Sequence, residues 1–295
     1  MATASGYSPV IESADGLRVE LDDDHPGFAD PRYRQRRDEI AAISASHVPG
    51  RPIPTVDYND TEHEVWRIVS RELAPKHARY ACRAFNNARE ELQLPTDHAP
   101  QLDEVSERLT PLTGFAYQPV AGLAPLRDFY GAFAERRFFS TQYLRHHSVP
   151  LYTPEPDIIH EVIGHANQLA DHDFASICAE VGQAVARTEA PEALAFMSRV
   201  FWFTLEFGVV MEDGEPKAYG AGLLSSYGEM DVFQRAEIRP LDFAEMGSTE
   251  YDITHYQPIL YSSSSFEQLV EDLTGFYGTF DDSVHERLVA ARTSA

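Results

Sequence analysis

The sequence is poor in basic residues, and this shortage excludes two classes of partner. Only 24 lysines and arginines stand against 47 aspartates and glutamates, so the formal net charge is −23. A surface of this sign repels both nucleic-acid phosphate and anionic lipid. We therefore expect neither a nucleic-acid partner nor a membrane partner.

Cysteine and long apolar runs are also scarce. The two cysteines, Cys82 and Cys178, lie far apart and neither belongs to a CxxC pair. A disulfide framework is not indicated, so the reducing cytoplasm is the expected compartment. The first residues lack the basic start and apolar core of a signal peptide. No apolar stretch approaches the ~20 residues that a membrane helix needs.

What remains is an ordinary globular composition. The 295 residues include 43% hydrophobic and 11% aromatic side chains, enough to bury a full core. No repeat or low-complexity linker divides the chain. We predict a single, mainly α-helical domain with a few short β-strands over residues 21–285, between a flexible N-terminal segment, 1–20, and a short C-terminal tail, 286–295.

Local signals place the expected elements. Asp30 before Pro31 predicts an N-cap and a helix over 31–45. Thr61 and Glu64 have the spacing of a capping box, and Asp213-Gly214 predicts a hairpin turn. Further helices are expected at about 76–93, 101–111, 125–134, 158–165, 174–187, 191–208 and, as the last one, 265–278.

The most informative stretch is YTPEPDIIHEVIGH, which ends at His165. Asp157 can cap the helix that follows the prolines, and that helix carries His160. Five residues advance an ideal α-helix by roughly 500°, which leaves the two imidazoles roughly 140° apart. They can reach one ion only if the helix ends or distorts between them, and Gly164 permits such a departure. The spacing is compatible with a shared metal but does not demand one.

Glu206 lies inside the apolar run FWFTLEFGVV, where an ionised carboxylate is expensive to bury alone. It can pair with a basic side chain, stay protonated, ligate a cation, or face water where the helix ends. Two histidines and one carboxylate suit a non-haem iron(II) oxygenase, and they suit catalytic zinc equally well.

Several segments in the same order resemble the pterin-dependent aromatic amino acid hydroxylases, and most closely the bacterial phenylalanine hydroxylases. The similarity spans roughly residues 20 to 280 and is carried by DDDHPGFADPRYRQRR, PIPTVDY, PQLDEVSERLTPLTGF, PVAGL, TQYLRHHSVPLYTPEPD, FWFTLEFGVV and KAYGAGLLSSYGE. The resemblance implies a monooxygenase that uses iron(II), a tetrahydropterin and dioxygen to convert free L-phenylalanine to L-tyrosine. Iron would be held by His160, His165 and Glu206.

The same resemblance implies a substrate site. Arg145 would bind the carboxylate of the amino acid, a pairing for which a guanidinium is well shaped. Thr153 and Ser225 would contact the polar end, while Pro156 and Trp202 would wall the aromatic ring. Without the resemblance, Arg145 reads as one half of a surface salt bridge.

For the pterin, the resemblance implies Gly122 and Leu123 in the binding loop and Phe129 stacked on the ring. Glu161 would act on the pterin through water. From the residues alone, Phe129 reads as plain core and Glu161 as a solvated helix residue.

The chain also departs from the family. Ala124, Pro125 and Leu126 replace the usual residues of the pterin loop, which puts the orientation of the pterin in doubt. Phe139 and Phe201 stand where animal members often have a histidine and a tyrosine, and they make the surroundings less polar.

The family comparison also bears on assembly and substrate. The chain has no room for the regulatory domain and tetramerisation helix of the animal enzymes, so we expect a monomer. Trp202 favours phenylalanine or tyrosine over tryptophan. Hydroxylation at the meta position, action on tyrosine or tryptophan, and a zinc hydrolase remain as alternatives.

Overall fold

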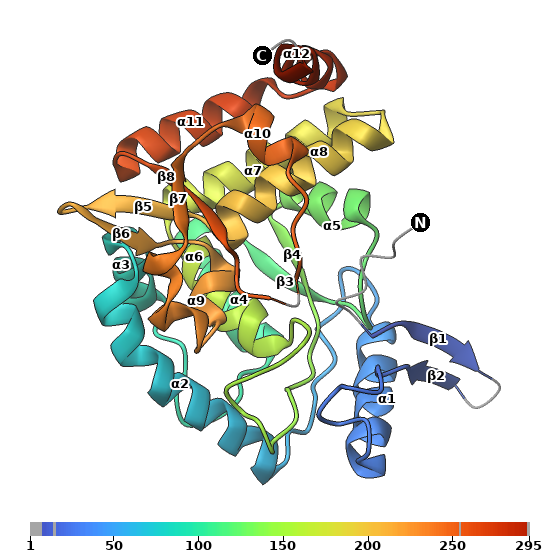
Figure 1. Cartoon of the computed structure of the whole chain (residues 1–295). Coiled ribbons are helices and arrows are strands. Elements are labelled where there is room, and N and C mark those ends of the chain that lie inside the picture. The colour runs from blue at the N-terminus through green and yellow to red at the C-terminus, as the bar shows by residue number, and fades with distance from the viewer. Residues whose placement is uncertain (1–7, 14–15, 254, 294–295) are drawn as a thin grey trace.

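Helices form most of the computed structural model of the chain, which describes residues 8–13, 16–253 and 255–293 (Figure 1). The described α-helices are α1 (Pro31–Ala45), α2 (Asp60–Tyr80), α3 (Arg83–Leu92), α4 (Leu102–Thr113), α5 (Leu126–Ala132), α6 (Asn167–Leu169), α7 (His172–Arg187), α8 (Pro191–Phe201), α9 (Ala221–Ser225), α10 (Phe243–Ser248), α11 (Phe266–Thr279) and α12 (Asp282–Thr293). Two π-helical segments, His160–Ala166 and Trp202–Glu206, complete the helical framework around the candidate site.

The strands are short and form three separate sheets. The largest has the order β6-β5-β8-β7, with β5 (Val209–Glu212) antiparallel to β6 (Glu215–Ala218) and parallel to β8 (Ile259–Ser263), which also pairs in parallel with β7 (Glu237–Pro240). A parallel pair joins β3 (Ala116–Pro119) to β4 (Arg137–Ser140). The expected mainly helical fold with a few short strands is confirmed.

The predicted start of α1 and the predicted hairpin turn are both confirmed. Asp30 Oδ1 accepts hydrogen bonds from the N–H groups of Arg32 and Tyr33, which satisfies donors that the first turn leaves free. Asp213 and Gly214 link β5 to β6 with φ angles of 53° and 81°. Two consecutive positive φ values characterise the tight turns that match the twist of a hairpin.

The predicted capping box at Thr61 and Glu64 is wrong by two residues. Asn59 caps α2, and Glu62 returns the reciprocal hydrogen bond to the Asn59 N–H. Both pairs have the same spacing, so the local pattern allowed either.

The expected boundary between a second and a third helix near residue 76 is also wrong. Helix α2 runs through Pro75 to Tyr80, and the chain leaves the helix at Ala81 and Cys82. There the Cys82 N–H donates to the carbonyl of Ala218, the last residue of β6. Tertiary pairing with the sheet, and not the proline, therefore sets the end of α2.

Both ends of the described chain hold structure that the sequence did not reveal. Within the segment expected to be flexible, β1 (Val10–Ser13) and β2 (Gly16–Val19) form an antiparallel pair beside α1 (Figure 1), while residues 1–7 lie outside the described part. At the other end, α12 follows α11 and packs on α8 and α10, so the expectation that the last helix ends near residue 278 is wrong.

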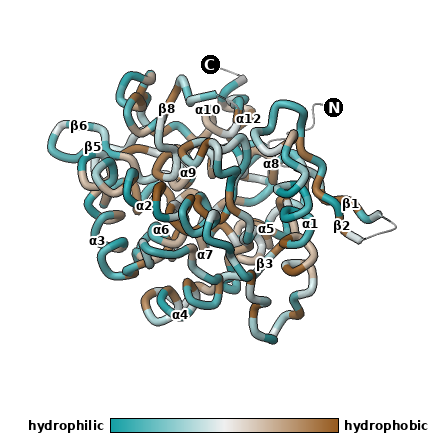
Figure 2. The backbone as a smooth tube through the Cα atoms, turned by 90° about the horizontal axis from the view of Figure 1, so that it is seen from below, coloured by the Kyte–Doolittle hydropathy of each residue, from teal (hydrophilic) through white to brown (hydrophobic). Residues whose placement is uncertain are grey.

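A continuous hydrophobic core runs from α2 to α11, and its largest fully buried side chains include Trp66, Phe115, Phe133, Tyr219 and Tyr261. Hydrophobic stretches gather toward the middle of the chain trace and hydrophilic ones at its outer loops (Figure 2). No helix in the described residues is long and apolar enough to cross a membrane. The hydrophobic core surrounds both π-helical segments, and this packing fixes the side chains that they carry.

Candidate active site

His160 and His165 come together because the helix that carries them is a π-helix. The segment His160–Ala166 has π-helical geometry, in which hydrogen bonds link residues five apart. Residues five apart then lie on one face, whereas an α-helix would separate them. The two imidazole centroids are 4.8 Å apart. The distortion that the spacing required is confirmed.

Glu206 reaches the same point from a second π-helical segment. Trp202–Glu206 continues α8, and the Phe207 N–H donates to Trp202 O, five residues back, at 2.9 Å. Glu206 Oε1 lies 3.0 Å from His165 Nε2, and Glu206 Oε2 lies 3.7 Å from His160 Nε2. Three candidate ligand atoms, two nitrogens and one carboxylate oxygen, thus lie within 4.8 Å of one another.

Burial and mutual proximity set the charges of this group. Burial acts to raise the pKa of Glu206, but the facing His165 and His160 outweigh it, and the pKa is lowered. Burial lowers the pKa of His160 to about 4 despite the nearby Glu206. At neutral pH an ionised carboxylate therefore faces a neutral imidazole, which is the protonation that metal ligation needs.

Ser225, at the end of α9, fixes the orientation of His160. Its hydroxyl donates to Gly222 O at 3.1 Å and lies 2.9 Å from His160 Nδ1. Because the only hydroxyl proton is used, Ser225 accepts from His160 Nδ1–H. The lone pair of His160 is then on Nε2, the atom that faces Glu206. A hydrogen-bonded far nitrogen is the usual second partner of a metal-binding histidine.

Two further contacts hold the π-helical segments in place. A Cβ on Gly164 would lie 2.7 Å from Ala221 O, so only glycine allows α9 to approach this closely. Gln168, fully buried, donates from Nε2 to Leu205 O at 3.1 Å and to Tyr219 O at 2.9 Å. Gln168 thereby links the segment of the two histidines to that of Glu206.

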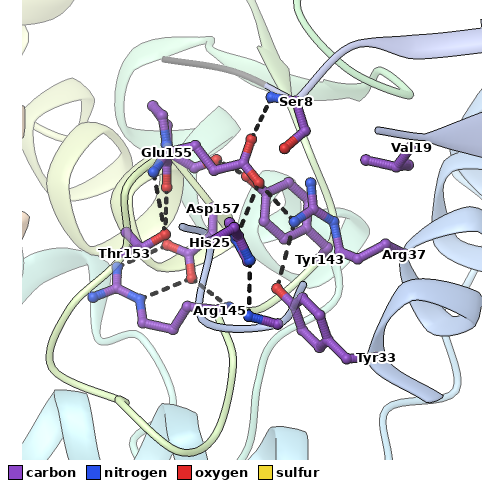
Figure 3. A network of polar contacts seen from close by, with 12 residues as sticks. Ser8, Val19, His25, Tyr33, Arg37, Tyr143, Arg145, Thr153, Glu155 and Asp157 are labelled. Atoms are coloured by element: carbon purple, nitrogen blue, oxygen red, sulfur yellow. Dashed lines mark hydrogen bonds and ion pairs between the residues drawn. The ribbon is translucent and has the colours of Figure 1, made fainter. Parts of the chain in front are cut away.

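Arg145 lies buried beside the site and is held by Asp157. Its Nε and Nη2 donate to the two oxygens of Asp157 at 2.9 and 2.8 Å, and its backbone N–H donates to Asp157 Oδ2 at 2.8 Å (Figure 3). Asp157 Oδ1 also accepts from the His160 N–H at 3.3 Å, as expected for a residue that caps this helix. One carboxylate therefore fixes both the guanidinium and the start of the helix that carries His160 and His165.

The loop between Arg145 and Asp157 is braced from α1. Arg37 donates to Glu155 Oε1 at 2.7 Å, and its guanidinium lies 3.3 Å from the centroid of the Tyr143 ring (Figure 3). The Tyr143 hydroxyl donates to Pro156 O. Thr153, half-buried, donates from Oγ1 to Glu155 O at 2.7 Å. These contacts hold Pro156 between two anchored residues.

Trp202 stands at the start of the second π-helical segment. Its indole Nε1–H donates to Gln257 Oε1 at 3.1 Å, and its ring stacks on Tyr251 at 4.1 Å with an interplanar angle of 8°. The Gln257 backbone N–H donates to buried Glu229 at 2.7 Å. Tyr251 and Gln257 thus support the indole by stacking and by a hydrogen bond.

Three of the residues expected at the pterin lie between β3 and β4 in the chain. Gly122 and exposed Leu123 belong to the loop that follows β3, and Phe129 is half-buried on α5. Phe129 packs edge-on against Phe138 at 5.6 Å, and Phe138 lies 4.7 Å from the His165 ring. Phe138, which the sequence did not single out, therefore separates Phe129 from His165.

Glu161 is buried, which corrects its reading from the residues alone as a solvated helix residue. Burial, with the nearby carboxylates of Glu206 and Asp157, raises the pKa of Glu161 well above its usual range. Of the two aromatic departures, Phe201 is buried against Tyr130 at 4.8 Å, and Phe139 is half-buried in β4.

The fold and this group of ligands define a helical enzyme domain with a two-histidine, one-carboxylate centre. Residues 11–288 match the family of biopterin-dependent aromatic amino acid hydroxylases. The chain belongs to that family.

Individual relatives agree with this assignment. The chain is 47% identical over 258 residues to a phenylalanine 3-hydroxylase of Streptomyces coeruleorubidus, covering 88% of this chain and 92% of the relative. It is 41% identical over 268 residues to the human phenylalanine-4-hydroxylase, covering 88% of this chain but 59% of the relative. The chain thus spans nearly all of the bacterial relative and somewhat over half of the human one.

Solved structures show the same fold. The apo phenylalanine hydroxylase of Colwellia psychrerythraea superposes with a TM-score of 0.74 at 30% identity, covering 84% of this chain and 94% of that one. A Chromobacterium violaceum phenylalanine hydroxylase with bound iron(III) and 7,8-dihydrobiopterin gives a TM-score of 0.68 at 28% identity, covering 74% and 81%.

Proposed function

We propose that this chain hydroxylates the ring of free L-phenylalanine with dioxygen, using iron(II) and a tetrahydropterin. The observation that carries the proposal is the convergence of His160, His165 and Glu206 from two π-helical segments, with Arg145 anchored nearby. Family membership disfavours the zinc hydrolase that the residues alone left open.

The ligand set fits the proposed metal. Two imidazoles and one carboxylate on one side of an ion leave further positions open, which is the arrangement of non-haem iron(II) oxygenases. When bound, iron(II) with the reduced pterin would supply the electrons that activate dioxygen. The chain itself contributes a neutral His160 oriented by Ser225 and an ionised Glu206. All three protein ligands are held in place before the ion arrives.

We assign the substrate's carboxylate to Arg145. Arg145 donates to Asp157 from Nε and Nη2, and these two hydrogen bonds fix the direction of the guanidinium. Nη1 does not donate to Asp157, so it can donate to the carboxylate of the substrate. Pro156 and Trp202 would then bound the ring, and Thr153 would contact the polar end. The resemblance implies that Ser225, like Thr153, contacts the polar end of the substrate, but Ser225 hydrogen-bonds to His160 instead. We propose that Ser225 acts by orienting this metal ligand.

We assign the pterin to the loop of Gly122 and Leu123, with Phe129 beneath its ring. Glu161, buried and with a raised pKa, would face the pterin as a neutral acid able to donate a hydrogen bond. This role differs from that of an ionised carboxylate, which can only accept.

We propose carbon 4 as the position of hydroxylation, because the bovine and human relatives are phenylalanine-4-hydroxylases. Carbon 3 is the second candidate, because the Streptomyces relative is a phenylalanine 3-hydroxylase and matches over nearly its whole length. The two outcomes share the metal, the pterin and the anchor at Arg145. They differ in which ring carbon is presented to the proposed metal.

Substitution of a ligand tests the proposed metal centre. His160→Ala should abolish hydroxylated product while circular dichroism and the unfolding midpoint stay close to those of the parent chain. His172→Ala, which removes an exposed imidazole at the start of α7, should retain full activity. Product formation by His160→Ala at the parent rate would refute the ligand assignment.

A further inference from the structure

A second group of metal-ligating side chains lies outside the candidate active site. Asp30, His146 and His147 place one ligand atom each within 4.8 Å of one another. Asp30 comes from the N-terminal end of α1, whereas the two histidines directly follow Arg145 in the chain. Their residue types repeat the two-histidine, one-carboxylate composition of the first centre.

Asp30 and His146 are already oriented toward each other. Asp30 uses Oδ1 to cap α1, which leaves Oδ2 to face His146 Nε2 at 3.3 Å. His146 is 7% exposed, and its ring lies edge-on to Tyr33 at 4.9 Å. These two ligands would therefore lose little conformational freedom on binding an ion.

The far nitrogen of His146 also has a partner. His146 Nδ1 accepts the Ser148 backbone N–H at 3.3 Å and lies 2.7 Å from Ser148 Oγ. In the metal-free chain the proton of a neutral His146 ring is therefore on Nε2, where it donates to Asp30 Oδ2. An ion bound at Nε2 would replace this proton, and Ser148 Oγ could then accept from Nδ1–H. A hydrogen-bonded outer partner of this kind fixes ring orientation and tautomer at metal sites.

His147 completes the group from the solvent side. It is exposed, and its ring centroid lies 4.4 Å from that of His146 with an interplanar angle of 38°. The ion would therefore enter from solvent, and water would fill the remaining coordination positions. The chain's net charge of −23 favours a cation at its surface.

We propose that Asp30, His146 and His147 form a second site for a divalent transition metal of the zinc type. Two imidazole nitrogens and one carboxylate oxygen suit Zn²⁺ and Co²⁺, while Mg²⁺ and Ca²⁺ prefer oxygen alone. The bound ion bridges the start of α1 to the residues after Arg145. Tyr33 already links these elements by donating to Leu144 O at 3.0 Å. The ion therefore stiffens the segment that positions Arg145.

Cobalt titration of the full chain, freed of metal, tests the proposal. Visible absorption and equilibrium dialysis should show two bound Co²⁺ in the parent chain and one in His160→Ala. One should also remain in His147→Ala, because only the second site is removed. The double variant His160→Ala/His147→Ala should bind none.

Three further variants sharpen the assignment on the His160→Ala background. Asp30→Asn keeps an N-cap acceptor for α1 but removes the charge, so Co²⁺ binding should weaken without loss of the helix. Ser148→Ala should weaken it by about tenfold or more, as removal of an outer partner does. His172→Ala, another exposed histidine near acidic side chains, should change nothing.

A parent chain that binds a single Co²⁺, or a His147→Ala variant that still binds two, would overturn the second site. Equal weakening in His147→Ala and His172→Ala would also overturn it, because binding would then reflect surface histidines in general. Hydrogen exchange of residues 144–148 in the His160→Ala protein should slow with Zn²⁺. Exchange unaffected by bound Zn²⁺ would overturn the bridge to Arg145.

Discussion

Ser225 illustrates how one hydroxyl can set the chemistry of a metal ligand. It donates to Gly222 O, so its remaining interaction with His160 must be as an acceptor. That single constraint leaves the lone pair of His160 on Nε2, the atom that faces Glu206. The sequence resemblance had implied a contact between Ser225 and the substrate, and the two roles predict different defects.

Ser225→Ala should lower the affinity for iron(II) by about 10- to 100-fold, because an outer partner of a histidine ligand is lost. The Michaelis constant for the amino acid, measured at saturating iron, should stay near that of the parent chain. Iron affinity is measured by anaerobic competition with a chelator. Ser176→Ala is the control, since Ser176 is exposed and donates only to His172 O of its own helix. A raised Michaelis constant with unchanged iron affinity would favour substrate contact instead.

Residue identities at the site were largely readable from the sequence, but their partners were not. The histidine spacing and the apolar run around Glu206 marked three residues that the structure brings together. The pairing of Arg145 with Asp157 leaves no local signal, because the two residues are twelve apart on an irregular loop. The support of Trp202 by Gln257 joins still more distant segments and had no sequence signature either.

At the scale of elements, the two π-helical segments bring the three proposed metal ligands, His160, His165 and Glu206, together. Sequence reasoning gave the requirement for a distortion between His160 and His165, because five residues do not fit one α-helical face. It named Gly164 as a residue that permits the helix to end or to distort. Gly164 instead lies within the helix, and its missing Cβ admits α9. Packing against another element, invisible to the local pattern, explains the residue.

Gly164→Ala should destabilise the fold by about 1–3 kcal/mol, because its methyl group would displace the Ala221 carbonyl. The displacement moves α9, so iron affinity should fall as well through Ser225. Gly275→Ala is the matched control, since a Cβ on this helical glycine of α11 meets nothing within 4 Å. That control should be neutral or stabilise by up to about 1 kcal/mol. Urea unfolding measures both, and equal stability of the two variants would contradict the packing argument.

Two errors at this scale have physical causes. Near residue 60, the pairs Asn59–Glu62 and Thr61–Glu64 both have the spacing of a capping box. The local sequence does not distinguish between them, and the structure uses Asn59. Helix α12 was missed because none of its described side chains is fully buried, so the apolar periodicity that signals a helix is weak. The monomeric state stays a prediction that nothing described in the fold tests.

At the scale of the whole molecule, buried carboxylates make stability depend on pH. Glu229 is 4% exposed, and burial raises its pKa to about 7, although a hydrogen bond from the Gln257 N–H opposes the shift. The folded state therefore holds this proton more tightly than the unfolded state. Its contribution is full below a pH of about 4.5 and is lost as pH rises through about 7.

Glu229→Gln keeps an acceptor for the Gln257 N–H but removes the titration. Between pH 5 and pH 8.5 the parent chain should lose up to about 3 kcal/mol more unfolding free energy than the variant. Urea titrations at both pH values measure the difference. Other buried groups, including Glu161, make the same contribution to the pH dependence of both proteins, so they do not affect the difference between the two. A parallel pH dependence of the two proteins would show that Glu229 is ionised in the folded state.

The central claim is that this fold directs an iron- and pterin-dependent attack on the ring of phenylalanine. The direct test is to load the chain with iron(II) without air, add tetrahydropterin, L-phenylalanine and air, and separate the products by chromatography. We predict tyrosine, with the hydroxyl on carbon 4, formed only when iron and pterin are both present. Meta-tyrosine would keep the site and move the hydroxyl to carbon 3. No hydroxylated product from iron-loaded protein would contradict the account.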